Sequence, residues 1–290
     1  MIEAYKLITR GEFIMKKVWS YLICVTLVIA LSSPVKTIAA TATADNVSYN
    51  GKTYKTSELS QDTINWLEWY NSLSDDLKEM VSHEPAELSS ANVELSINEP
   101  SFDNSFKLSE SKLLDDSSVD FLSAQIMSLP SDLPVVYPYA PVYNPNYWNS
   151  SNNIKHANCY AYCLNYRTPE EGKLQPGDLS GARYSSLTKT AIVKAAKADG
   201  PVIKRTITDS TKAAKPGKNQ YKIALVIAPN TDYHWYIQNR DGYWSHKRGL
   251  EEISNLDASG KKITDPQTCN RNYGNNLNYS VFCGYYLVKY

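Results

Sequence analysis

The stretch that decides the fold is DYHWYIQNRDGYWSHK, residues 232–247. Its first half alternates aromatic or apolar residues with polar ones, which is the pattern of a half-buried β-strand. Residues 239–242 (NRDG) have the composition of a type I turn closed by a left-handed glycine, a three-residue loop with a G1 bulge. This turn places Tyr236 opposite His246, so that His234 and His246 share one face as diagonal neighbours. A two-residue turn would shift the register by one and separate the two imidazoles, so the turn chemistry predicts that they cooperate.

The beginning of the chain is typical of a secretory leader. A basic region opens at Met15, residues 18–31 form an apolar run of signal-peptide length, and A-x-A cleavage sequences follow between Ala40 and Ala44. We therefore predict that residues 1–44 are an upstream extension and signal peptide. The mature protein is expected to be secreted, extracellular or associated with the cell wall, without stable membrane insertion after cleavage.

The formal net charge of the whole chain is zero, but the charges are unevenly distributed. Residues 41–129 hold 5 Lys/Arg and 16 Asp/Glu, a net charge of −11, whereas residues 130–290 hold 20 Lys/Arg and 12 Asp/Glu, a net charge of +8. Three interpretations remain open: the acidic half docks on the basic half, the basic half binds an anionic partner, or the two halves are solvated independently.

The acidic half predicts little structure of its own. Ser60 and Ser74 are suitable N-caps for two short helices, which together make residues 45–84 a small helical segment. Residues 85–129 are rich in Ser, Asp and Glu and predict a partly disordered linker. Short helices are marginal alone, so residues 45–128 are expected to dock on the basic domain as an inhibitory or folding-assisting prosegment. The alternative is a tether or a separate binding module that makes no contact with that domain.

Residues 130–290 predict one compact α+β domain. Prolines between Pro130 and Pro145 predict an extended, non-helical entry. Helices are expected at residues 159–166 and 185–199, and strands at 202–207, 221–228 and 279–288 in addition to the hairpin. A helix that bears a cysteine and is followed by an antiparallel sheet is the element order of a papain-like hydrolase.

Cys159 is the candidate nucleophile. It is the first residue of a helix that Asn158 caps, and the helix N-terminus stabilises a thiolate. An activated thiolate needs a histidine, which a third polar group must orient. His234 is the expected base and His246 the expected orienting group, with Asp241 and Asp257 as rivals for that role. The backbone N–H of Cys159 and the side chain of Asn153 are candidate oxyanion donors, and Asn158 is a further candidate for an oxyanion or orienting role.

These residues resemble the NlpC/P60-type peptidases of the papain-like superfamily. The sequence NCYAY at residues 158–162 is similar to the cysteine-bearing helix start of that family. His234 and His246 are similar to its strand histidine and third-position histidine, including the twelve-residue separation. The resemblance implies a papain-like fold and a Cys-His-His hydrolase that cleaves peptide bonds, often in peptidoglycan stem peptides. Two features depart from the family pattern: the long interval between Cys159 and His234, and Asn158 where aspartate is common.

Other functions are less favoured by the sequence. His156 and Cys163 near Cys159 suggest zinc, but no second closely spaced Cys/His pair follows. We therefore predict no metal site and no cofactor, since no Gly-rich phosphate loop is present either. A disulfide between Cys269 and Cys283 is compatible with the cysteine count. Nucleic acid is not an expected partner. The alternatives to a hydrolase of peptides or extracellular protein are a non-catalytic wall- or host-binding module and a secreted toxin-like hydrolase.

Overall fold

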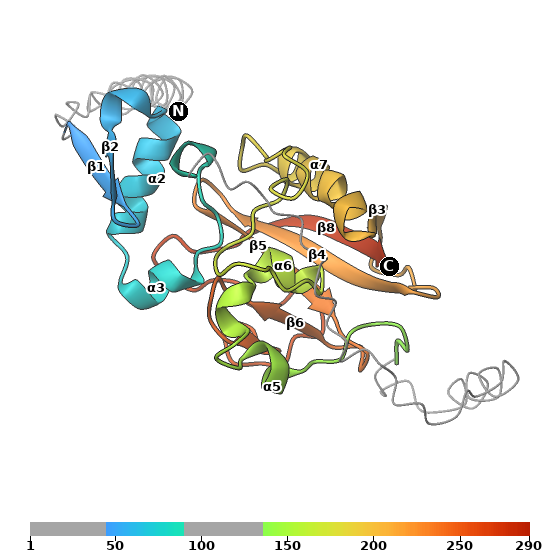
Figure 1. The fold of residues 1–290 in the computed structure, drawn as a ribbon. Coiled ribbons are helices and arrows are strands. Elements are labelled where there is room, and N and C mark those ends of the chain that lie inside the picture. Colours follow the sequence, from blue (N-terminus) through green and yellow to red (C-terminus); the bar gives the residue numbers. More distant parts are fainter. Residues whose placement is uncertain (1–44, 90–135) are drawn as a thin grey trace, which may run out of the picture. The chain divides into compact units, whose positions relative to one another are not determined.

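A computed structural model describes residues 45–89 and 136–290 (Figure 1). The described residues from Val47 onward belong to one compact unit. Residues 47–84 of the predicted helical segment and the described part of the predicted catalytic domain therefore lie in the same unit. The predicted signal peptide and most of the predicted acidic linker lie outside the described residues.

The described elements form a mixed α/β fold with antiparallel sheets. The α-helices are α2 (Gln61–Asn71), α3 (Asp75–Met80), α5 (Pro145–Trp148), α6 (Cys159–Cys163) and α7 (Lys189–Asp199). The 3₁₀ helices are η1 (Thr56–Glu58), η2 (Ala86–Leu88), η4 (Ile154–His156) and η5 (Gly200–Ile203). The strands are β1 (Asn46–Tyr49), β2 (Lys52–Lys55), β3 (Thr206–Ser210), β4 (Gln220–Ala228), β5 (Asp232–Gln238), β6 (Trp244–Lys247), β7 (Ile253–Ser254) and β8 (Val281–Lys289).

The main sheet has six strands in the order β3-β8-β4-β5-β6-β7, and all its neighbours are antiparallel (Figure 1). The predicted hairpin register is confirmed, because Tyr236 pairs with His246. Gly242 has a φ of 81°, and its N–H donates to the carbonyl of Asn239 at 2.9 Å. The predicted left-handed glycine therefore closes the turn and fixes which side chains share a face.

The two faces of the sheet bury different clusters. Alternate residues of β4 and β5, including Leu225 and Trp235, pack with α6 and α7 in one core. The intervening residues, including Val226 and Tyr236, pack with residues 49–88 and with the loop before β8 in a second core. This follows from the two-residue period of a strand, and it leaves both faces of β4 and β5 buried.

Residues 47–89 contribute their aromatic side chains to the second core. Ser60 caps α2 as predicted, accepting a hydrogen bond from Thr63 N. Trp66 lies 3% exposed, stacks on Tyr70 at 4.8 Å between ring centroids, and donates through Nε1 to the carbonyl of Thr231 at 2.8 Å. Two short helices that could not bury their apolar faces alone therefore bury them against the sheet.

Three local predictions are wrong. Pro145 begins α5 rather than excluding it, because proline is tolerated at the first helical position, where its missing N–H has no partner in any helix. The strand expected at residues 202–207 begins only at Thr206, since the preceding residues form η5. Cys269 and Cys283 are free, so the disulfide considered for them is absent.

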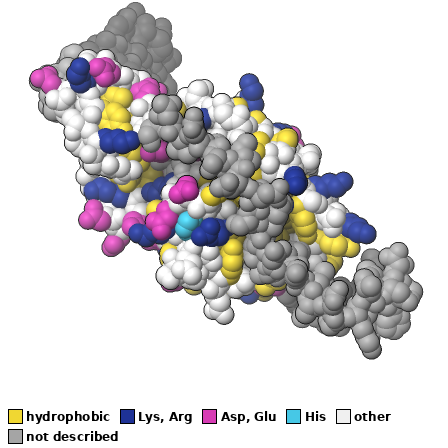
Figure 2. Space-filling view, viewed as in Figure 1, with side chains coloured by type: hydrophobic (Ala, Val, Ile, Leu, Met, Phe, Trp, Pro, Cys, Tyr) yellow, Lys and Arg dark blue, Asp and Glu magenta, His cyan; other side chains and the backbone are white. Residues whose placement is uncertain are grey.

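The surface carries charges of both signs. On the face shown in Figure 2, lysine and arginine side chains are scattered among acidic and uncharged ones. Among the described residues, no helix has the length and apolar character needed to cross a bilayer.

The turn of the hairpin gives a testable prediction. Gly242→Val is expected to lower the free energy of unfolding by about 2 kcal/mol, because a β-branched residue resists the left-handed conformation. Urea unfolding measures the change. Gly242→Asn is the control and should cost clearly less, since asparagine tolerates this region. Equal losses for the two variants would mean that backbone conformation is not what the glycine supplies.

Candidate functional site

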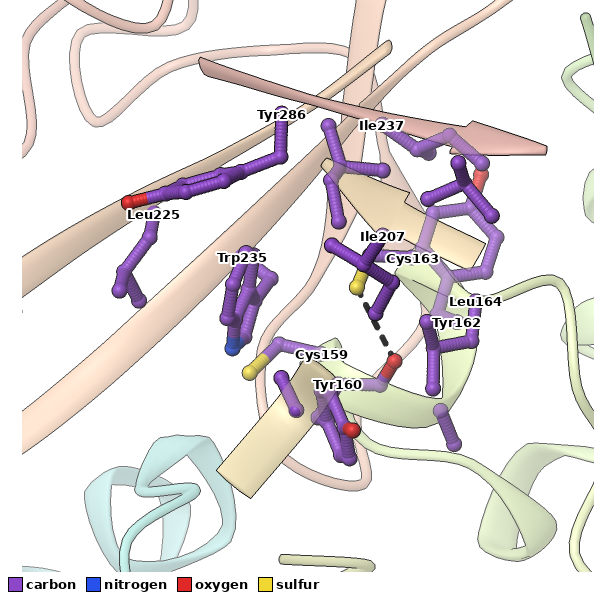
Figure 3. Close-up of a cluster of buried hydrophobic side chains, with 14 of the residues drawn as sticks. Cys159, Tyr160, Tyr162, Cys163, Leu164, Ile207, Leu225, Trp235, Ile237 and Tyr286 are labelled. Carbon is purple, nitrogen blue, oxygen red and sulfur yellow. Dashed lines mark hydrogen bonds between the residues drawn. The ribbon is translucent and has the colours of Figure 1, made fainter. Parts of the chain in front are cut away.

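Cys159 begins α6, as predicted. Asn158 is the N-cap, and its Oδ1 accepts a hydrogen bond from Ala161 N at 3.2 Å. The cysteine is fully buried beside Trp235, in the core that also contains Tyr160 and Cys163 (Figure 3). The helix N-terminus thus supplies the position expected of an activated thiol, but not an exposed one.

The surroundings of the thiol keep it protonated. Burial raises the pKa of Cys159 to about 12, and the Asp232 carboxylate acts in the same direction. The Ser82 hydroxyl and the backbone N–H groups of Trp235 and Tyr160 oppose this rise. Ser82 lies close to the thiol, although its hydroxyl completes no hydrogen bond within the described residues. The lowered pKa expected from the helix N-terminus is therefore not found in this state, because desolvation is the larger effect.

The two histidines form the predicted pair. His234 Nε2 and His246 Nδ1 are 2.8 Å apart, and both rings are buried. His246 Nε2 lies 3.0 Å from the carbonyl of Leu256, and the ring stacks on Tyr236 at 5.0 Å. A carbonyl accepts only, so His246 carries its proton on Nε2, and its Nδ1 accepts from His234 Nε2. The imidazole of His234 is thereby held in one orientation and one tautomer.

Burial keeps both histidines neutral. It lowers the pKa of His234 well below its ordinary range, and repulsion from His246 and Arg248 adds to the effect. Burial also lowers the pKa of His246 to about 3, with Arg248 acting in the same direction. In this tautomer His234 Nδ1 is an acceptor, and it has no hydrogen-bond partner among the described residues. A buried acceptor without a partner is unusual and is the atom available to receive a proton.

The thiol of Cys159 lies beside the backbone of β5, the strand that carries His234. The backbone N–H of Trp235, the residue after His234, faces the thiol of Cys159. β6 pairs with β5 only from Tyr236 onward, so the start of α6 can approach this edge of β5. However, α6 packs on the face that carries Trp235, whereas His234 shares the opposite face with Tyr236 and Tyr279. No hydrogen bond joins Cys159 to either histidine in the described part of the chain.

The two asparagine candidates serve local structure. Asn158 Nδ2 donates to the carbonyl of Leu174 at 2.8 Å while its oxygen caps α6. Asn153 Nδ2 donates to the carbonyl of Tyr147, and its Oδ1 accepts from Arg167 Nε at 2.7 Å. Both amides are therefore occupied, and the structure does not direct Asn153 toward the thiol.

The two aspartate candidates make their hydrogen bonds to nearby backbone groups, and neither is hydrogen bonded to His234 in the part of the chain that the structure describes. Asp241 accepts a hydrogen bond from Tyr243 N within the turn. Asp257 accepts from the N–H groups of Ser259, Lys261 and Asn270 and organises its own loop. The orienting position next to His234 is occupied by His246.

Residues that sequence reasoning missed surround the thiol. Asp232 is fully buried, and its carboxylate accepts from Ser82 N, His83 N and the Tyr279 hydroxyl. Burial raises the pKa of Asp232 to about 6. Its position was detectable, because it precedes His234 by two residues on the same strand and so shares its face. Ser82 carried no comparable signal in the sequence.

No group of three His, Cys, Asp or Glu side chains is arranged to hold a metal ion within residues 45–89 and 136–290. Cys163 instead donates through Sγ to the carbonyl of Tyr160 at 3.1 Å (Figure 3). His156 Nδ1 lies 2.9 Å from the carbonyl of Thr168. The pair considered as zinc ligands in the sequence thus has structural partners.

Comparison with known proteins gives one relative. No family model matches the chain, and no solved structure matches it. The chain is 36% identical over 129 residues to insoluble matrix shell protein 1 of Ruditapes philippinarum, an alignment that covers 44% of this chain and 80% of that protein. This identity over most of the relative's length shows common descent, and the chain therefore belongs to the family of insoluble matrix shell protein 1.

Proposed function

We propose that this protein is a secreted cysteine hydrolase with a papain-like, NlpC/P60-like arrangement, acting on peptide or amide bonds. The observation that carries the proposal is the orphaned Nδ1 of His234. The other ring nitrogen is oriented by His246, which the Leu256 carbonyl orients in turn. A purely structural histidine pair gives no reason to leave this buried acceptor unpaired among the described residues.

In the proposed reaction, His234 Nδ1 takes the proton of Cys159 as the sulfur attacks the carbonyl carbon. His234 then returns the proton to the leaving amine, and water hydrolyses the thioester. His246 fixes the tautomer and shares the positive charge that develops on His234. Because α6 packs on the face of β5 opposite to His234, the reaction requires a rearrangement that brings the thiol to Nδ1 in the productive complex. The start of α6 supplies backbone N–H groups for the oxyanion.

The predicted leader, together with a relative that is named as a shell matrix protein, supports a place outside the cell. Peptide crosslinks of a cell wall or an extracellular matrix are the substrate class that fits both the resemblance and this location.

The test is peptide hydrolysis by the purified chain. Cys159→Ala and His234→Ala are expected to reduce hydrolysis to background, because they remove the nucleophile and the base. Cys163→Ala, which removes a buried thiol one helical turn away, is the matched control and should retain activity. The proposal would be contradicted if the Cys159→Ala variant still hydrolysed peptides. It would also be contradicted if the wild type hydrolysed none even when its Cys159 thiol reacts readily.

A second candidate function is a non-catalytic wall or matrix module. It is favoured by the protonated, fully buried thiol and by the name of the relative. In this case Cys159 and the histidines serve only to pack the two cores. Cys159→Ala would then leave binding to insoluble wall or matrix material unchanged, and no variant would hydrolyse peptides.

A further inference from the structure

Residues 78–84 cross the candidate site and are held by groups from the rest of the unit. Lys173 Nζ donates to the carbonyl of Lys78 at 2.9 Å, and Leu250 N donates to the carbonyl of Glu79 at 3.1 Å. Gly249 lies so close to Glu79 that a Cβ added there would overlap the Glu79 carbonyl oxygen. The backbone of the segment is thus fixed on the side where it enters the site.

The centre of the segment is bound by two buried polar side chains. The carboxylate of Asp232 accepts from Ser82 N at 3.0 Å and from His83 N at 2.6 Å. Gln175 Nε2 donates to the Ser82 carbonyl at 2.7 Å, and its Oε1 accepts from Glu84 N at 3.4 Å. Asp232 and Gln175 are 0% exposed, so these bonds are shielded from water.

The far side of the segment is held by a guanidinium. Arg183 donates to the backbone carbonyl of Glu84 at 2.6 Å and lies 3.4 Å from the Glu84 carboxylate. The side chain of His83 packs between Trp66, Tyr184 and Tyr233, while the small side chain of Ser82 faces the thiol of Cys159. Most of these contacts are made to the main chain, so they would accept other sequences.

We propose that Lys173, Gln175, Arg183 and Asp232 form a peptide-binding groove over Cys159, and that residues 78–84 occupy it as an internal blocking segment. The groove binds the main chain of a peptide. It requires a small residue at the position of Ser82, because the thiol of Cys159 leaves little room there. This inference rests on the proposed function in one respect: residues 78–84 occupy the place of a substrate because Cys159 is taken as the nucleophile. It names the substrate class as a peptide lying along the path of residues 78–84.

The test is the rate at which iodoacetamide alkylates Cys159 in the folded full-length chain, followed by peptide mass spectrometry. Gly249→Ala forces Glu79 away, whereas Gly260→Ala places a methyl group in open space at another glycine with positive φ. Arg183→Gln removes the contacts to Glu84, and Lys197→Gln, which breaks an ion pair with Asp209, is its control. Gly249→Ala and Arg183→Gln should speed alkylation of Cys159 about 10-fold or more, as expected for local opening.

Cys163 reports on global unfolding, because it is buried on the same helix. If Cys159 reacts at the wild-type rate in both opened variants, or reacts faster only together with Cys163, the proposed groove is overturned. A synthetic peptide of residues 78–84 should slow alkylation again in the opened variants, and the same peptide with Ser82→Trp should not. No protection by the first peptide would also overturn the groove. Opening and protection without hydrolysis would leave the groove standing and overturn the hydrolase.

Discussion

Trp66→Ala is expected to lower the free energy of unfolding by about 3–5 kcal/mol, the range for truncating a buried tryptophan. The indole is almost fully buried, stacks on Tyr70, and meets Tyr49 and His83 edge-on. Its truncation also leaves the Thr231 carbonyl without this donor. Since domains are stable by only about 5–15 kcal/mol, this loss would be a large share of the total.

Urea unfolding followed by far-ultraviolet circular dichroism measures this change. Trp69→Ala is the matched control: it is the same residue type in the same helix, but Trp69 is only partly buried, and its Nε1 bonds to Asn275 near the surface. Its truncation should cost about 1–2 kcal/mol on the area removed from water. The wild type should unfold in one transition, because residues 47–89 share a core with the sheet. A separate early transition, with Trp66→Ala affecting it alone, would show that this segment is an independent unit.

The parts of the fold that local chemistry determines were predictable. Residues 239–242 specify a turn with one register, and this register alone brings His246 onto the face of His234. The caps at Ser60 and Asn158 were predictable for the same reason, since a cap is an interaction between residues three apart.

The state of the site depends on contacts that no local pattern contains. A helix N-terminus lowers the pKa of a cysteine, and this is what the local sequence predicts for Cys159. However, Ser82, which lies 77 positions earlier in the sequence, helps to bury the thiol, and burial raises the pKa. Sequence could list Asp241, Asp257 and His246 as candidates for the orienting role. It could not show that the loops fold the aspartates onto their own backbones, nor that the Leu256 carbonyl completes the chain of hydrogen bonds.

The free energy of unfolding is expected to fall as the pH is lowered from 8 to 5. Burial lowers the pKa of His83 to about 3, as it does that of His246, and it lowers the pKa of His234 as well. Unfolded histidine takes up its proton near pH 6.5. Below that pH the unfolded chain binds protons that the folded chain excludes, so these groups stabilise the fold only while they are neutral. Each costs about 1.4 kcal/mol per pH unit once the unfolded state is protonated.

Carboxyls whose pKa is raised by desolvation oppose this trend only in part. Burial raises the pKa of Asp232 and of Asp178 to about 6, so the folded chain takes up protons there before the unfolded chain does. Asp199 and Glu251, whose pKa values burial also raises, act in the same direction, and this uptake stabilises the fold as the pH falls.

Burial lowers the pKa of Lys247 to about 7, so the folded chain also excludes this proton as the pH falls from 8 to 7. Together Lys247 and the three histidines exclude protons over a wider pH range than the carboxyls take them up. The net loss between pH 8 and pH 5 is expected to be roughly 3 kcal/mol. Urea unfolding at several pH values measures the slope of the free energy of unfolding against pH. His246→Gln should reduce that slope by the equivalent of one proton, about 1.4 kcal/mol per pH unit. An unchanged slope in His246→Gln, or stability that rises toward pH 5, would mean that the histidine pair is charged in the folded protein.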